Sequence, residues 1–413
     1  MTLSIDRDLL AQELNQLGAI SDFPLPAVTR IVFSPADLRA REYVAALCRD
    51  AGLALRADAV GNTFARWTGD APELAAVGTG SHIDAIPNAG SYDGTVGVLG
   101  GLEAIRALQR TGFQPHRSIE LLIFTAEEPT LFGIGCLGSR FLAGLMEAAG
   151  DSLLDTDGRT LNQIREAAGF KGSLASTRLP VGYYAAFVEL HIEQGPLLER
   201  AGLPIGIVTA IAAPAALRLI IEGEGGHAGA VLMPERHDAF LAAAEIALAL
   251  EKAARASGAI DTVATTGICD LFPAAINSIP SRVRMTVDVR DTDQARRDRV
   301  LQELAQAITD AEQRRGVRIE KHVISVDAPA LCDPAIVDVL EGACRTHSLA
   351  YQKMVSRAYH DSLFVSRFAP TAMLFIPCRG GVSHRPDEYA SPAAIADGVT
   401  VLAEALAKLS LLS

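Results

Sequence analysis

A strand–loop–helix stretch near residue 80 limits the fold more than any other part of the sequence. It begins with an apolar run at 74–77 that stops at two glycines, which is typical of a short buried strand. His82 and Asp84 then alternate along extended chain, and Asp93 follows a loop rich in Pro, Gly and Asn. Apolar residues recur at helical spacing over 95–108. This order predicts an α/β protein with a polar site above the edge of its sheet.

Two more apolar runs end in charged residues in the same way. The run at 118–125 is nearly continuous, as in a central strand, and it leads into Glu127 and Glu128. The run at 185–192 contains His191 near its end. Helical segments alternate with these runs. The sequence therefore predicts a three-layer α/β/α domain whose site lies at one edge of the sheet.

The pattern changes between residues 214 and 329. The order there is strand, helix, strand, strand, helix, strand, with long helices expected at 238–256 and 293–315. Four strands and two helices predict a compact α+β unit inserted into the α/β domain. We therefore expect 1–213 and 330–413 to form the catalytic domain, and 214–329 to form the inserted domain.

Composition excludes several classes of protein. The net charge of −12 argues against a nucleic-acid binder, which needs a basic surface. No apolar run is long enough to span a membrane, and the first residues lack the basic and apolar segments of a signal peptide. The six cysteines are scattered without a Cys-x-x-Cys pair, as expected for reduced thiols. We expect a cytoplasmic protein that contacts neither nucleic acid nor membrane.

Four strand ends, or the loops after them, carry side chains that bind divalent metals: His82 and Asp93, Glu127 and Glu128, His191, and His384. Each alone is also compatible with a polar strand end, a solvated turn or a surface loop. Together, three histidines and two carboxylates match a site for two divalent ions that share one carboxylate. Two such ions, roughly 3.5–4 Å apart, activate a water and polarise a carbonyl. One of the two glutamates is then spare to transfer protons.

Five motifs resemble those of the dinuclear metallohydrolases of the aminoacylase and carboxypeptidase superfamily, and within it the ureide and N-carbamoyl amino acid amidohydrolases. They are Gly-Ser-His-Ile-Asp at 80–84, Asn-Ala-Gly-Ser-Tyr-Asp-Gly at 88–94, Glu-Glu-Pro at 127–129, Glu-Leu-His-Ile-Glu-Gln-Gly-Pro at 189–196 and Ser-His at 383–384. The resemblance covers nearly the whole chain.

The resemblance implies a role for each candidate residue of the metal site. One metal would be held by His82 and His191 and the other by Glu128 and His384, with Asp93 bridging them. Glu127 would be the general base. Asp84 would orient His82, because a metal-binding histidine usually donates its other ring N–H to a partner. The inserted domain would be the lid and the homodimer interface.

The same resemblance implies a set of substrate contacts: Gln194, His227, Asn277, Arg290, Tyr359 and His360. Arg290 has the bidentate geometry that suits a substrate carboxylate. His227 is expected to act in catalysis by stabilising the oxyanion. Either residue is also compatible with a structural role, His227 in its Gly-rich turn and Arg290 as a salt-bridge partner.

Residues 356–364 and 375–379 most resemble ureidoglycolate amidohydrolases. Tyr359 stands where allantoate and carbamoyl amino acid hydrolases tend to carry Gly, and it would fill the room that a longer substrate needs. The resemblance thus implies hydrolysis of the ureido C–N bond of ureidoglycolate to glyoxylate, ammonia and carbon dioxide, in purine and ureide catabolism. Allantoate or an N-carbamoyl-L-amino acid is the alternative substrate. A binding-only relative is disfavoured because every metal ligand is present.

The cofactors implied are two divalent metal ions, with Mn²⁺ favoured over Zn²⁺, and this ligand set accepts either ion. The expected partners are a small anionic ureide substrate and a second copy of the chain.

Overall fold

The computed structural model describes residues 3–412 and divides the chain into two compact units. The first comprises Met1–Thr209, Cys332–Ser356 and His360–Ser413, and the second comprises Ala210–Leu331 and Arg357–Tyr359. The short segment Arg357–Tyr359 therefore belongs to the second unit, although the chain on both sides of it belongs to the first.

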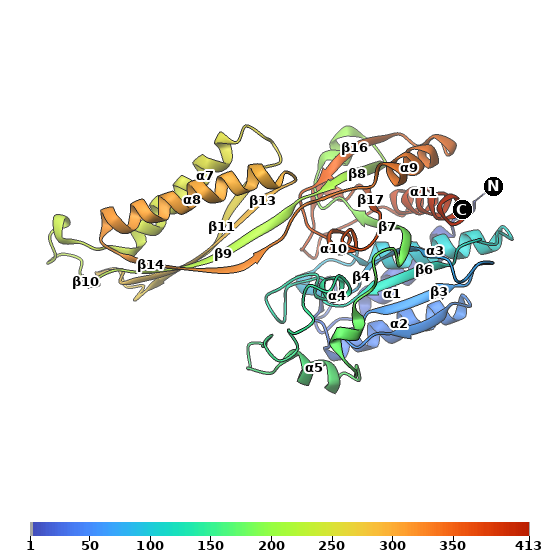
Figure 1. Ribbon diagram of the computed structural model, residues 1–413, viewed down its shortest axis with the longest axis horizontal. Helices are drawn as coiled ribbons and strands as arrows, with labels where there is room; N and C mark the ends of the chain where they lie inside the picture. Colours follow the sequence, from blue (N-terminus) through green and yellow to red (C-terminus); the bar gives the residue numbers. More distant parts are fainter. Residues whose placement is uncertain (1–2, 413) are drawn as a thin grey trace. The chain divides into compact units, whose positions relative to one another are not determined.

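A nine-stranded sheet is built mainly from strands of the first unit (Figure 1). Its strands are β2 (Ala54–Ala57), β3 (Thr63–Trp67), β4 (Ala76–His82), β6 (Ile119–Phe124), β7 (Tyr184–Ile192), β8 (Ile205–Ile211), β15 (Ala330–Leu331), β16 (Tyr351–Ser356) and β17 (Thr371–Ile376). Their order is β15-β8-β17-β7-β4-β6-β3-β2, with β16 paired to β8. The neighbours β17, β7, β4 and β6 are parallel. Their carboxyl ends therefore meet at one edge of the sheet.

Helices cover both faces of this sheet (Figure 1). On one face, α3 (Thr95–Arg110) packs on β4 and β7, and it contacts α1 (Arg7–Ala19) and α11 (Pro392–Ser410). The helix α11 also contacts α9 (Pro334–Thr346). On the other face, Leu142 of α4 (Leu137–Leu142) and Val365 of α10 (Asp361–Val365) pack in one buried cluster with Phe124 and Phe187. The predicted α/β domain is confirmed.

The remaining elements of the first unit are short, apart from α2 (Pro35–Asp50). They are β1 (Val28–Arg30) and β5 (Ala85–Ala89), which pair with each other, α5 (Leu161–Ala167), α6 (Leu197–Ala201), η1 (Leu174–Thr177) and η3 (Arg379–Gly381). Local chemistry sets the helix boundaries. For example, the Ser34 hydroxyl accepts the Asp37 amide at the start of α2, where Pro35 supplies a preset φ.

The second unit is a four-stranded antiparallel sheet covered on one face by two helices (Figure 1). The strand order is β11 (Val263–Phe272), β13 (Arg282–Asp291), β9 (Ala213–Glu222) and β14 (Arg318–Val326). The helices are α7 (Ala239–Ala256) and α8 (Gln294–Arg315), and their apolar faces share one core with the sheet. A short pair, β10 (Gly226–His227) and β12 (Ser278–Ile279), and η2 (Met233–Glu235) complete it. The predicted inserted α+β unit is confirmed.

Within residues 3–412, no helix combines the length and the apolar character that crossing a bilayer requires.

Candidate metal centre and active site

The parallel strands of the first unit carry the predicted metal ligands to a common edge. His82 is the last residue of β4, and His191 is the next-to-last residue of β7. Glu128 follows β6, Asp93 precedes α3, and His384 follows β17 and η3. These side chains come from four different connections, and the parallel register of β6, β4, β7 and β17 brings them together.

The five side chains form two groups that share Asp93. Its Oδ1 lies 3.1 Å from His191 Nε2 and 3.8 Å from His82 Nε2. Its Oδ2 lies 3.1 Å from His384 Nε2, which is in turn 3.3 Å from Glu128 Oε1. Within each group, all potential ligand atoms lie within 4.8 Å of one another. Two groups of nitrogen and oxygen donors joined by one carboxylate fit two divalent ions.

Two backbone carbonyls fix which ring nitrogen of each buried histidine faces Asp93. His82 Nδ1 donates to the Asp84 carbonyl over 3.0 Å, and His191 Nδ1 donates to the Ile192 carbonyl over 2.9 Å. Since a carbonyl oxygen only accepts, each Nδ1 carries a hydrogen, and each Nε2 is the ring nitrogen that faces Asp93. Both rings are therefore oriented as metal ligands require.

Asp84 acts on this site in two ways. Its carbonyl orients His82, whereas its carboxylate accepts the backbone amides of Glu127 and Glu128 over 3.2 and 3.0 Å. The carboxylate lies farther from His82, with Oδ1 at 3.7 Å from Nδ1. The sequence pointed to Asp84 as the partner of His82, but it did not show that the side chain fixes the two glutamates instead.

Close packing of acidic groups sets the electrostatics of the site. Burial raises the pKa of Glu128 to about 8 and the pKa of Glu127 well above its usual range, and neighbouring carboxylates add to both effects. Burial alone disfavours charge on Asp93 too, but its hydrogen bonds with His191 and His384 hold the pKa of Asp93 well below normal. This concentration of carboxylates is stabilised by any cation bound among them.

The histidines respond oppositely to their surroundings. Burial lowers the pKa of His82 to about 4, so this ring is neutral near pH 7. Burial also acts to lower the pKa of His191, but the hydrogen bond and charge of Asp93 outweigh it and raise this pKa to about 9. The hydrogen bond of His384 to Asp93 likewise raises its pKa to about 9.

Glu127 is set apart from the two donor groups. Its Oε2 lies 3.8 Å from His82 Nε2, and its Oε1 accepts a hydrogen bond from the Cys136 thiol over 3.4 Å. It makes no close pair with His384, unlike the neighbouring Glu128.

Sequence reasoning missed the residues that hold Asp93 in place. Buried Glu388 accepts the Tyr92 and Asp93 amides through Oε1 and the Ser383 hydroxyl through Oε2. Gln194, predicted as a substrate contact, donates its Nε2 to Asp93 Oδ2 over 2.9 Å. For Glu388, the only signal in the sequence was its closeness to His384. A glutamate in a charged loop segment is ordinarily expected to be exposed.

Gly94 marks how closely the site is packed. Its φ is +67°, and a Cβ there would lie 2.4 Å from His82 Nε2. Its amide also donates to His191 Nε2 over 3.2 Å. A side chain at this position would therefore enter the space beside His82, within the donor group of His82, His191 and Asp93.

The predicted substrate contacts divide between the two units. His360 is buried in the first unit, where its ring centroid lies 4.5 Å from that of His191 and its Nε2 pairs with the Ser356 hydroxyl over 3.0 Å. His227 and Asn277 are exposed in the second unit, where the amide of Ala228, the residue after His227, donates to the Asn277 carbonyl.

Arg290 and Tyr359 lie together in the second unit. The guanidinium carbon of Arg290 is 5.4 Å from the centroid of the Tyr359 ring, within the range of a cation–π contact. Arg290 Nε also donates to Asp288 Oδ1 over 2.7 Å, so the salt bridge that the sequence left open as an alternative is present.

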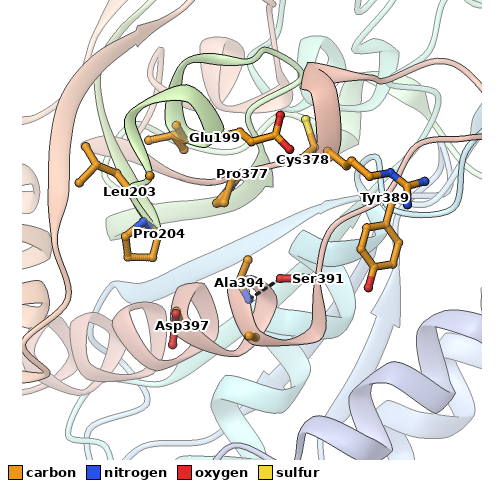
Figure 2. Close-up of a pocket in the computed structure, with 13 residues that line it drawn as sticks. Glu199, Leu203, Pro204, Pro377, Cys378, Tyr389, Ser391, Ala394 and Asp397 are labelled. Atoms are coloured by element: carbon orange, nitrogen blue, oxygen red, sulfur yellow. Dashed lines mark hydrogen bonds between the residues drawn. The ribbon is translucent and has the colours of Figure 1, made fainter.

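A separate hollow of about 500 Å³ opens beside α6 and the start of α11 (Figure 2). Leu203, Pro204 and Pro377 form an apolar part of its wall, and Ser391, which accepts the Ala394 amide, lies at its edge. None of the predicted metal ligands or substrate contacts lines it. The hollow is therefore distinct from the candidate metal centre.

Comparison with known proteins identifies the family of the chain. The model of the family "Peptidase family M20/M25/M40" matches residues 78–408. A ureidoglycolate hydrolase of Oryza sativa subsp. japonica is 52% identical over 98% of this chain and 85% of its own length. An N-carbamoyl-L-amino acid amidohydrolase of Geobacillus stearothermophilus is 37% identical over 96% of this chain and 97% of its own length.

The fold agrees with these relatives. The crystal structure of AtUAH in complex with glyoxylate matches with a TM-score of 0.92 at 51% identity, and the match covers 99% of each chain. The chain therefore belongs to the peptidase family M20/M25/M40, and it is an amide-bond hydrolase of the branch that contains the ureidoglycolate and N-carbamoyl amino acid hydrolases.

Proposed function

We propose that this protein hydrolyses the ureido C–N bond of ureidoglycolate and yields glyoxylate, ammonia and carbon dioxide. The observation that supports ureidoglycolate as the substrate is the 52% identity with a ureidoglycolate hydrolase over 98% of the chain. The hydrolytic chemistry is supported by the two donor groups around Asp93, which are complete in this sequence.

The proposed metal ligands follow the two groups. His82, His191 and Asp93 Oδ1 would hold one ion, and Glu128, His384 and Asp93 Oδ2 the other. Bound divalent ions supply Lewis acidity toward the ureido carbonyl and lower the pKa of water. We propose Mn²⁺ as the native metal and Zn²⁺ as the alternative, since nitrogen and oxygen donors of this kind accept both.

Glu127 is the proposed general base. Its Oε1 is occupied by the Cys136 thiol, and its Oε2 faces the donor group of His82. From this position Oε2 would accept a proton from the attacking water and later return it to the leaving nitrogen. The separation of Glu127 from His384 supports this assignment over the reverse one with Glu128.

Gln194 is the proposed contact for the ureido group. Its Nε2 is committed to Asp93, which fixes the orientation of the amide. Its Oε1 is buried, and within residues 3–412 it has no hydrogen-bond partner. A buried acceptor without a donor costs free energy, and a ureido N–H would satisfy it.

The second unit would supply the remaining contacts. Arg290 would bind the substrate carboxylate, and the packing of Tyr359 on its guanidinium supports a joint role in selecting the substrate. His227 would stabilise the oxyanion, with Asn277 and His360 as further substrate contacts.

A homodimer through the inserted domain is part of the proposal. In the described sheet of the second unit, β11 is an edge strand, and its Ile268, Leu271 and Phe272 side chains are exposed. An open apolar edge strand is a surface that pairs with another strand. A cytoplasmic location is proposed from the six cysteines, all of which are free.

Ammonia release from three substrates tests the function. The purified protein, loaded with Mn²⁺ or with Zn²⁺, would be offered ureidoglycolate, allantoate and N-carbamoyl-L-amino acids. We expect ureidoglycolate to give the highest kcat/KM, with Mn²⁺ more effective than Zn²⁺. A preference for allantoate or for a carbamoyl amino acid would assign the protein to that activity instead.

A further inference from the structure

The segment after Glu127 folds back so that Cys136 meets it. The amides of residues 136–138 donate in turn to the carbonyls of Glu127, Ala126 and Thr125, over 2.7, 2.8 and 2.8 Å. Cys136 has a left-handed φ of 56°, which is uncommon for a residue with a side chain. Three consecutive hydrogen bonds hold this conformation, and they direct the side chain toward Glu127.

The contact between the two side chains is specific. Cys136 Sγ lies 3.4 Å from Glu127 Oε1, and the cysteine is fully buried. Among residues 3–412, this thiol is the single hydrogen-bond donor to the Glu127 carboxylate. Burial also raises the pKa of Cys136 well above its usual value, so the sulfur stays a neutral S–H donor. A thiol in this state is not a nucleophile.

We propose that Cys136 is a positioning residue that holds the Glu127 carboxylate with Oε2 turned toward the attacking water. This inference rests on the proposed role of Glu127 as the base. A glutamate has several rotatable bonds, and a base works only within hydrogen-bond reach of the proton it takes. A thiol is a weak donor. It therefore orients the carboxylate while competing little for its lone pairs.

The alternative is that Cys136 only fills space in the core, as buried free cysteines commonly do. Steady-state kinetics of the metal-loaded protein on ureidoglycolate separate the two roles. We expect Cys136→Ala to lower kcat about threefold to tenfold, the size of one lost hydrogen bond. KM should change little, and Cys136→Ser, which keeps a donor, should regain most of the lost rate. Metal content should match the parent protein in both variants.

Cys48→Ala is the matched control. Cys48 is as fully buried as Cys136, but it lies in α2, and among residues 3–412 its thiol makes no hydrogen bond with Glu127. Cys48→Ala should lower the melting temperature about as much as Cys136→Ala does and leave kcat unchanged. Should Cys136→Ala not fold, Cys136→Gly removes the thiol and suits the left-handed backbone.

A double-mutant cycle decides whether Cys136 acts through Glu127. In the Glu127→Gln background, Cys136→Ala should have almost no further effect on the residual rate. The inference would be overturned if Cys136→Ala lowered kcat by the same factor in both backgrounds. It would also be overturned if Cys136→Ala kept a parent-like kcat while Glu127→Gln was inactive. Either result would leave the role of Glu127 intact. A parent-like kcat in Glu127→Gln would instead overturn the proposed base, and the role of Cys136 with it.

Discussion

Asp93 lies between the two donor groups with one carboxylate oxygen facing each, and the two adjacent glutamates lie differently with respect to these groups. Glu128 lies with His384 beside Asp93 Oδ2, whereas Glu127 faces His82 and the Cys136 thiol. Neighbours in sequence thus face different partners, while the Asp84 carboxylate accepts both of their backbone amides.

The first prediction at the scale of single residues concerns the base. Glu127→Gln should retain both metals but lower kcat by about a hundredfold or more, since an amide cannot accept the proton of the attacking water. Metal analysis and steady-state kinetics on the same preparation check this. If Glu127→Gln loses metal while Glu128→Gln keeps it and only slows turnover, the two roles are reversed.

The second prediction concerns the choice of substrate. Tyr359→Gly should lower turnover of ureidoglycolate and raise that of allantoate relative to it, because in the proposed role of Tyr359 its phenol would occupy the room that a second ureido arm needs. Arg290→Lys is the comparison variant and should weaken both activities alike, by tenfold or more for a lost charged pair. An unchanged ratio of the two kcat/KM values in Tyr359→Gly would disprove the role of Tyr359.

At the scale of elements, the start of α3 places Asp93 and Gly94 beside the candidate metal ligands. Gly94 precedes this helix and Gly112 lies just beyond its end, and both have left-handed φ values, +67° and +75°. An added Cβ meets His82 at position 94 and nothing within 4 Å at position 112. The two glycines therefore form a matched pair for substitution.

The third prediction uses this pair. Gly94→Ala and Gly112→Ala should each cost about 1–2 kcal/mol of stability from backbone strain. Gly94→Ala should also lose metal and activity, whereas Gly112→Ala should keep both. Calorimetry and metal analysis distinguish them. Equal metal content in the two variants would mean that the space beside His82 is not needed for binding.

Local patterns predicted the elements and the candidate metal ligands, because these residues stand at the end of an apolar run or in the loop after it. Because β4 and β7 are parallel neighbours in the sheet, His82 and His191 at their carboxyl ends lie close together. Contacts between distant segments were beyond prediction. Neither the Glu388 contact with the Asp93 amide nor the docking of Arg357–Tyr359 on the second unit leaves a local pattern.

At the scale of the whole molecule, the site affects stability as well as chemistry. Burial raises the pKa of Glu128 from 4.5 to about 8, so the fold favours the protonated carboxyl. In the metal-free protein, the contribution of this group to the free energy of unfolding is therefore lost as the pH rises through about 8. Contact with Asp93 raises the pKa of His384 from 6.5 to about 9, and that contribution is lost as the pH rises through about 9. Both shifts therefore act in the same direction.

The fourth prediction follows from this sign. Metal-free protein should melt at a lower temperature at pH 9 than at pH 6.5, and added Mn²⁺ should stabilise it more at the higher pH, because metals compete with protons for these ligands. Differential scanning calorimetry with and without chelator measures this. In Glu128→Gln the dependence on pH should be weaker. A metal-free protein that is more stable at pH 9 would contradict the assigned shifts.

Titration of metal-free protein with Mn²⁺, followed by ammonia release from ureidoglycolate, tests the central claim most directly. That claim is that the donor groups around Asp93 hold two ions and hydrolyse this substrate. We predict no ammonia without metal and a rate that saturates at two ions per chain. Ammonia release by the chelated protein, saturation at one ion, or no release at any Mn²⁺ concentration would contradict it.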